Sequence, residues 1–211
     1  MHIVYIHGNR ATPNCFNFIR SQLSRQHEIV LEYDSEQGFY NNHERMLQQL
    51  QGIDEIFFIA HSLGGIHALH LANALADKTR GGVTVSTPYG GSEAAVLARL
   101  VLPFTQVLKD IHPLSAPVLQ SKEFKIERPW TNVVSIHGGS PFMAKPNDGV
   151  VTRDSMRDRS DIDLVDVESN HYEVLQSPET VKIIKDMLAA LDAEPAQTVP
   201  YGSLDGRRFA S

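Results

Sequence analysis

Three residues that lie far apart in the sequence have the side chains from which a nucleophilic triad can be built. Ser62 has a hydroxyl, His171 an imidazole and Asp148 a carboxylate. An imidazole can take the proton of a serine hydroxyl, and a carboxylate can orient the imidazole and stabilise its charged form. A serine activated in this way attacks a carbonyl carbon and forms an acyl-enzyme intermediate. This chemistry requires that the surrounding elements bring the three side chains to one place.

Ser62 stands in a pattern typical of a sharp turn between a strand and a helix. Residues 56–60 are apolar throughout, and residues 63–76 have apolar side chains near helical spacing. A serine at such a turn is forced into a strained backbone conformation that holds its hydroxyl above the sheet. The positions two before and two after it must be small, and Ala60 and Gly64 satisfy this need. We therefore predict Ser62 as the nucleophile, and we expect it to cap the helix that follows.

Two backbone amides are expected to bind the oxyanion that forms during acyl transfer. The first is the amide of Leu63, the residue after the nucleophile. The second should follow an early strand, and His7-Gly8-Asn9 ends the apolar run at residues 3–6. Gly8 permits a turn that aims the Asn9 amide inward. We therefore predict Asn9 and Leu63 as the two donors.

The base must be a histidine on a loop at the same edge of the sheet, and the chain has ten histidines. His171 directly follows the last predicted strand, where this arrangement requires the base. His67 and His70 lie inside the predicted helix after the nucleophile, so we interpret them as packing or surface residues. His61 precedes the nucleophile, and its side chain is expected to point away. His137 ends an earlier strand and could line the pocket, though not as the base.

The acid is predicted on a loop between the nucleophile and the base. Residues 147–151 (Asn-Asp-Gly-Val-Val) follow the predicted strand that ends at Ile136. Asp148 then completes the chain order serine, aspartate, histidine. Glu93 and Asp154 are competing carboxylates, and we favour Asp148 because of its place after the strand.

Short apolar runs alternate with segments of helical period along the rest of the chain. Strands that are apolar on both faces and separated by helices indicate a parallel sheet with helices on both faces. We predict an α/β fold of about six mostly parallel strands, with the binding loops at the carboxyl edge of the sheet. The predicted strands are residues 3–6, 29–33, 56–60, 82–86, 132–136 and 162–167, and the predicted helices are residues 16–23, 43–50, 63–76 and 178–191.

Residues 90–130 depart from this rhythm, because four prolines separate short apolar pieces. We predict a small cap-like insertion over one edge of the sheet. Its first part is apolar nearly all round, which suits an acyl chain and helps to exclude water. Leu97, Leu100 and Phe104 are the candidates for an apolar wall of the substrate pocket.

The composition limits the class of protein. The 211 residues, 42% of them hydrophobic, fit a single domain over residues 1–192 followed by a C-terminal tail at residues 193–211. The net charge of −6 argues against nucleic acid as a partner. No apolar run approaches the roughly 20 residues that span a bilayer. Cys15 is the single cysteine, so no intrachain disulfide can form. If Met1 is the native start, no signal peptide is present and a cytoplasmic location is expected.

Taken together, these motifs resemble the small bacterial lipases and esterases of the α/β-hydrolase superfamily. The resemblance extends over nearly the whole chain, from about residue 2 to about residue 191. It implies an α/β-hydrolase fold that lacks the superfamily's first two strands, and a serine esterase activity. The motifs that carry it are the His7-Gly8 pair, residues 60–65 (Ala-His-Ser-Leu-Gly-Gly), residues 86–92, residues 147–151 and Asn170-His171.

The expected function is therefore hydrolysis of carboxylic esters by Ser62, His171 and Asp148. The expected partner is a small-molecule ester with a short to medium acyl chain. The same triad would also serve an acyltransferase, a thioesterase or an amidase, and a non-catalytic binding protein on a hydrolase scaffold is an alternative of another class. No cofactor or metal is expected, because the sequence has no ligand cluster such as His-Glu-x-x-His.

Overall fold

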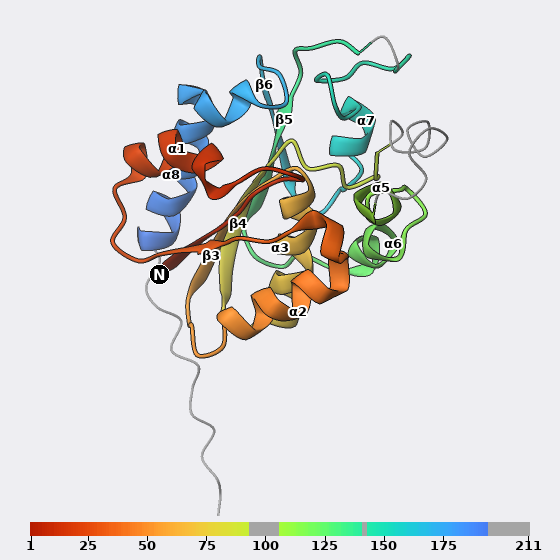
Figure 1. Cartoon of the computed structure of the whole chain (residues 1–211). Coiled ribbons are helices and arrows are strands. Elements are labelled where there is room, and N and C mark those ends of the chain that lie inside the picture. Colours follow the sequence, from red (N-terminus) through yellow and green to blue (C-terminus); the bar gives the residue numbers. More distant parts are fainter. Residues whose placement is uncertain (93–105, 141–142, 194–211) are drawn as a thin grey trace, which may run out of the picture.

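Six parallel strands form one sheet in the part of the chain that the structure, a computed structural model, describes: residues 1–92, 106–140 and 143–193 (Figure 1). The strand order is β2-β1-β3-β4-β5-β6, and each neighbouring pair is parallel. The predicted parallel sheet is confirmed. The strands are β1 (His2–Ile6), β2 (Glu28–Leu31), β3 (Ile56–His61), β4 (Thr79–Val85), β5 (Trp130–Ser135) and β6 (Asp163–Val167).

Helices cover both faces of this sheet, as predicted (Figure 1). Helices α1 and α8 pack against one face, and α2 and α3 cover the other with α6 beside α3. The α-helices are α1 (Asn17–Leu23), α2 (Phe39–Gln49), α3 (Leu63–Ala74), α5 (Gln106–Asp110), α6 (Ala116–Glu123), α7 (Arg153–Met156) and α8 (Pro178–Ala193). The short 3₁₀ helices are η1 (Pro13–Phe16), η2 (Ser35–Gln37) and η3 (Glu173–Gln176).

Side-chain alternation in the central strands builds a separate core on each face. In β1, Ile3 and Tyr5 pack toward α1 and α8, whereas Val4 and Ile6 pack toward α2 and α3. All four side chains are buried. A strand that is apolar on both faces is what a parallel sheet between two helix layers requires.

Helix α2 begins at Phe39, earlier than the predicted start at residue 43. The Phe39 amide donates a hydrogen bond to the Asp110 carboxylate at 3.0 Å, which satisfies one of the unpaired amides at the helix start. Asp110 lies in α5, far along the chain, so local periodicity cannot reveal this partner. Strand β4 also begins earlier than predicted, at Thr79, because it pairs there with Ile56 of β3.

Much of the predicted cap and most of the predicted tail lie outside the described residues. This holds for residues 93–105, which include Leu97, Leu100 and Phe104, and for residues 194–211. In the described remainder of the predicted insertion, α6 packs beside α3 and α5 packs beside η2. None of the helices in the described ranges is both long enough and apolar enough to cross a bilayer.

Stacked aromatic rings fill the space between α2 and α3. His67 lies parallel to Phe39 with ring centroids 4.0 Å apart, and the Tyr33 ring meets it at 4.9 Å. His67 and His70 are both buried, as expected for packing residues. Among the described residues, neither ring nitrogen of His67 has a hydrogen-bond partner. The His67 ring therefore packs as an apolar group, and burying its charged form would be costly.

Mild acid is expected to destabilise the folded chain through these histidines. Burial lowers the pKa of His67 well below its usual value and the pKa of His70 to about 4. In the unfolded chain each histidine binds a proton near its ordinary pKa of about 6.5, so the unfolded state gains protons first as the pH falls. We expect stability to fall below about pH 6.5, by about 1.4 kcal/mol per pH unit for each such histidine.

Urea unfolding between about pH 7 and pH 5 measures this loss. His67→Phe keeps a ring beside Phe39 and removes one titrating group, so its stability should depend less steeply on pH. The slope is the readout, because the larger ring can change the stability at every pH. The exposed His27→Gln variant is the control and should keep the wild-type slope. A free energy of unfolding that stays constant over this range would contradict the prediction.

Candidate active site

Ser62 lies in the turn between β3 and α3, at the carboxyl edge of the sheet. Its φ of 53° and ψ of −125° fall in a region that non-glycine residues rarely adopt. A Cβ atom at Gly64 would lie 2.3 Å from the carbonyl oxygen of Ile6, so only glycine lets α3 approach β1 this closely. Ser62 is the N-cap residue of α3, as expected, but its side chain makes no capping hydrogen bond. The strained turn directs the hydroxyl toward His171 instead.

The three triad side chains form one chain of hydrogen bonds. The Ser62 Oγ atom lies 3.1 Å from His171 Nε2, and His171 Nδ1 lies 2.7 Å from Asp148 Oδ2. The exposed fractions are only 6%, 2% and 1% for Ser62, His171 and Asp148. An ionised carboxylate only accepts, so Nδ1 carries the hydrogen in this bond. In the neutral ring Nε2 then has a free lone pair for the hydroxyl proton.

Asp148 is held as a charged acceptor by several donors. Its Oδ1 atom accepts from the amides of Val150 at 3.0 Å and Val151 at 2.8 Å, and Oδ2 also accepts from the Ser135 hydroxyl at 2.5 Å. Burial by itself would raise the pKa of Asp148, but the bonds from His171, Ser135 and Val151 outweigh it and lower the pKa. Sequence analysis missed Ser135, whose only signal is a hydroxyl at the end of β5, next to the acid loop.

Of the two competing carboxylates, the structure describes one. Asp154 is exposed and pairs with Lys145 at 3.5 Å, so it does not approach the triad. Glu93 falls outside the described residues. The expectation that His137 could line the pocket is wrong: its exposed side chain lies 4.0 Å from Glu168. His137 follows the end of β5, where the chain has already left the sheet.

The expectation that His61 points away is also wrong. Its ring is 3% exposed, lines the cavity at Ser62, and places Nε2 2.9 Å from the carbonyl oxygen of His171. A carbonyl only accepts, so Nε2 of His61 carries a hydrogen. Burial, reinforced by the neighbouring His171, lowers the pKa of His61 to about 3, which keeps the ring neutral. Strand alternation offered a signal, because His61 shares the sheet face of Phe57 and Ile59.

The loop after β1 brings the Asn9 amide to the same place. His7 Nε2 accepts from the Tyr33 amide at 3.3 Å, so its Nδ1–H donates to the Gly8 carbonyl at 2.8 Å. Among the described residues the Asn9 amide has no hydrogen-bond partner, and Asn9 lines the cavity at the nucleophile. Leu63 is the first residue of α3, so its amide has no partner within the helix. Asn9 at the cavity and Leu63 directly after the nucleophile therefore remain the candidates for the predicted oxyanion donors.

A cavity of about 200 Å³ opens beside the triad. Its walls come from the loop after β1, the turn at the nucleophile, the acid loop and η3. Among the residues that the structure describes, none of the lining side chains is an aspartate, glutamate, lysine or arginine. The lining residues are Gly8, Asn9, Ala11, Cys15, His61, Ser62, Val150, His171, Tyr172, Leu175 and Gln176.

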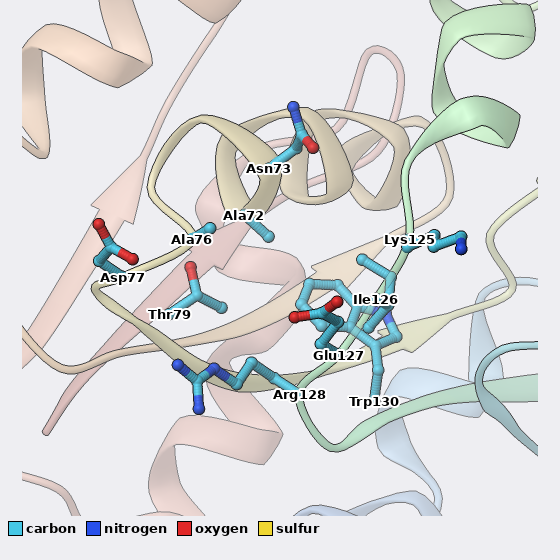
Figure 2. A pocket seen from close by; sticks show the side chains of 10 residues that line it. All are labelled: Ala72, Asn73, Ala76, Asp77, Thr79, Lys125, Ile126, Glu127, Arg128 and Trp130. Carbon is cyan, nitrogen blue, oxygen red and sulfur yellow. The ribbon is translucent and has the colours of Figure 1, made fainter. Parts of the chain in front are cut away.

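A second cavity, of about 140 Å³, lies at the opposite edge of the sheet (Figure 2). Thr79 and Trp130, the first residues of β4 and β5, line it together with Lys125 and Arg128 (Figure 2). The Thr79 hydroxyl donates to the carbonyl of Leu75 at 2.9 Å, so it is not poised for chemistry. Among the described residues no cluster of three or more histidine, cysteine or acidic side chains could hold a metal ion. The triad cavity is therefore the candidate active site.

Solved structures with the same fold are numerous. The sequence matches no protein-family model, and it matches no curated protein. The mature lipase BlEst2 of Bacillus licheniformis superposes with a TM-score of 0.68 at 15% identity, covering 89% of this chain and 91% of the lipase. The metagenomic carboxyl esterase MGS0156 gives 0.68 at 15% identity, covering 91% of this chain and 75% of the esterase. The haloalkane dehalogenase DatA of Agrobacterium tumefaciens C58 gives 0.64 at 12% identity over 90% and 89%. The chain therefore has the α/β-hydrolase fold.

Proposed function

We propose that this chain is a serine hydrolase that cleaves carboxylic esters. The observation that carries the proposal is the buried hydrogen-bond chain from the Ser62 hydroxyl through His171 to Asp148. In a buried site with few competing waters, such a chain activates a hydroxyl that would otherwise be a weak nucleophile.

Each residue of the site has a role in the proposed reaction. His171 takes the hydroxyl proton as Ser62 attacks the carbonyl carbon, and Asp148 stabilises the imidazolium that forms. The amides of Asn9 and Leu63 donate to the oxyanion of the tetrahedral intermediate. His171 then gives its proton to the leaving alcohol, which departs and leaves the acyl-enzyme. In the second half of the reaction, His171 takes a proton from water as the water oxygen attacks the acyl carbon, and it returns that proton to the Ser62 oxygen as the acid is released.

The fold does not choose the reaction, because a dehalogenase shares it with a lipase and a carboxyl esterase. The residues at the turn favour acyl transfer, since a serine hydroxyl faces the base there. An acyltransferase, a thioesterase or an amidase would use the same triad. A non-catalytic binding protein is the weaker alternative, because none of the three triad residues is missing.

The test is a screen of p-nitrophenyl acetate, butyrate and octanoate beside a matching thioester and a matching anilide. We expect turnover of at least one ester, with much slower turnover of the anilide, because an amine is the poorer leaving group. Preference for the thioester, or acyl transfer to an added alcohol in place of hydrolysis, would favour the corresponding alternative. Folded protein that hydrolyses none of these substrates would favour the binding protein.

His61 gives a further prediction about this activity. His61→Phe keeps an aromatic ring but removes the hydrogen bond to the backbone carbonyl of His171. We expect kcat to fall about tenfold with little change in KM, because a lost buried hydrogen bond of about 1–2 kcal/mol loosens the base. His70→Phe is a matched control, since the buried His70 ring bonds the Pro117 carbonyl at 2.9 Å on the other face of the sheet. Equal effects of the two variants on kcat would contradict the prediction.

A further inference from the structure

The cavity beside Ser62 has a wall that continues into the protein core. Leu175 of η3 is buried within the apolar cluster under α1 and α8, and Cys15 of η1 packs against the same cluster. Both side chains also line the cavity. Core packing leaves little room for such side chains to move. The positions of Cys15 and Leu175 are therefore fixed, so the size of a group that can bind between them is limited.

The Cys15 thiol is suited to forming a wall and not to acting as a second nucleophile. Burial raises the pKa of Cys15 to about 11, so the thiol stays protonated at neutral pH. A protonated cysteine behaves as a small hydrophobic side chain. Cys15 therefore offers an apolar surface to a bound group.

The charge of the lining limits the chemistry of the bound group. Apart from the two histidines, no described side chain of the lining is acidic or basic. A charged group in this cavity would lose water without gaining an opposite charge from these side chains, which is strongly unfavourable. The cavity therefore suits an uncharged group.

The volume limits the size of that group. Pockets that take drug-sized ligands measure about 300–1,000 Å³. The cavity at Ser62, of about 200 Å³, is smaller than these, so it suits a short acyl group such as butyrate better than a long one.

We propose, on the basis of the proposed esterase function, that Cys15 and Leu175 restrict the substrate of Ser62 to esters with a short, uncharged acyl group. The two residues are specificity-determining residues, and they take no part in the chemical steps. An apolar wall formed by Leu97 and Phe104 predicts the opposite preference, because it favours medium-length chains over short ones. Octanoate therefore separates the two interpretations.

The experiment compares kcat/KM for p-nitrophenyl acetate, butyrate and octanoate in the wild type, Cys15→Ser and Cys15→Phe. We expect the wild type to prefer butyrate over octanoate by about tenfold or more. Cys15→Phe fills the cavity and should lower butyrate turnover about tenfold while acetate turnover changes little. Cys15→Ser is the control of nearly equal size and should keep the wild-type profile. Leu175→Ala should shift the preference toward octanoate.

A separate comparison of esters tests whether the acyl group must be uncharged. The p-nitrophenyl monoester of succinate carries a carboxylate, and the p-nitrophenyl ester of 4-oxopentanoate has an uncharged methyl ketone of the same number of non-hydrogen atoms in its place. We expect kcat/KM for the succinate ester to be lower than that for the 4-oxopentanoate ester by about tenfold or more. Equal turnover of the two esters would overturn the proposal that the cavity takes only uncharged acyl groups.

Labelling of Ser62 with a small fluorophosphonate distinguishes a failure of this proposal from a failure of the esterase function. If Cys15→Phe is labelled like the wild type but has an unchanged chain-length profile, the proposal is wrong and the function stands. If the wild type is neither labelled nor active on any ester, the function itself fails. If Cys15→Phe does not fold, Cys15→Met replaces it, because a flexible methionine adds volume with less strain on the packing. Butyrate turnover should then fall more than acetate turnover, and equal loss on both would overturn the proposal.

Discussion

Replacing Ser62 with alanine is expected to lower ester turnover by about 10⁶-fold, the loss known for a serine protease that is deprived of its nucleophile. The reason is that no other hydroxyl in the described cavity lies against His171: the Ser62 Oγ atom, 3.1 Å from Nε2, is the group that the base can deprotonate. Without it no acyl-enzyme forms. The oxyanion donors alone would leave only a small residual rate.

Mass spectrometry of the fluorophosphonate-labelled protein tests the same point. We expect one label, on the peptide that contains Ser62, and none in Ser62→Ala. Ser24→Ala is the matched control, because Ser24 also has a positive φ, of 49°, but its hydroxyl donates to the carbonyl of Ser21. Ser24→Ala should keep both the label and the turnover. A label on another serine of the folded protein would show that the nucleophile is misassigned.

Asp148→Asn is expected to lower kcat by about 10³–10⁴-fold, as in the trypsin example of the same substitution. The amides of Val150 and Val151 both donate to Oδ1, so the asparagine oxygen must occupy that position. The NH₂ group of the asparagine then takes the position of Oδ2 and faces Nδ1 of His171. Two donors cannot bond to each other, so the imidazole moves its hydrogen to Nε2. In that tautomer it cannot take the proton of Ser62.

Asp154→Asn is the control for this substitution, because it removes an exposed carboxylate on the same stretch of chain that forms an ion pair with the exposed Lys145. We expect its kcat to stay within about threefold of the wild type, as for a surface ion pair. Circular dichroism confirms that both variants fold. A mild effect of Asp148→Asn together with a severe effect of Glu93→Gln would reassign the acid.

Local patterns in the sequence were sufficient to predict the parallel sheet and to single out the three residues that form the hydrogen-bond chain. The apolar side chains of strand β3 and those of helix α3 follow different periods, which reveals where the strand ends and the helix begins. The small residues around Ser62 are required because α3 approaches β1 closely there. His171 and Asp148 were found because parallel strands end at the same edge of the sheet, so residues that follow strands meet there. The chain order of the three residues then agreed with the resemblance. These features are local, or follow from the direction of the strands.

Contacts between distant segments decided the rest. His61 bonds the backbone of a residue 110 positions later, and Ser135, at the end of the strand that leads into the acid loop, bonds the acid 13 positions later. Cys15 lines the cavity because η1 packs across from η3, and α2 starts early because Asp110 reaches its first turn. Apart from the strand alternation at His61, no periodicity or spacing marks these residues. A hydrogen bond or a cavity wall depends on where two segments meet in space, and only packing of the helices on the sheet fixes those positions.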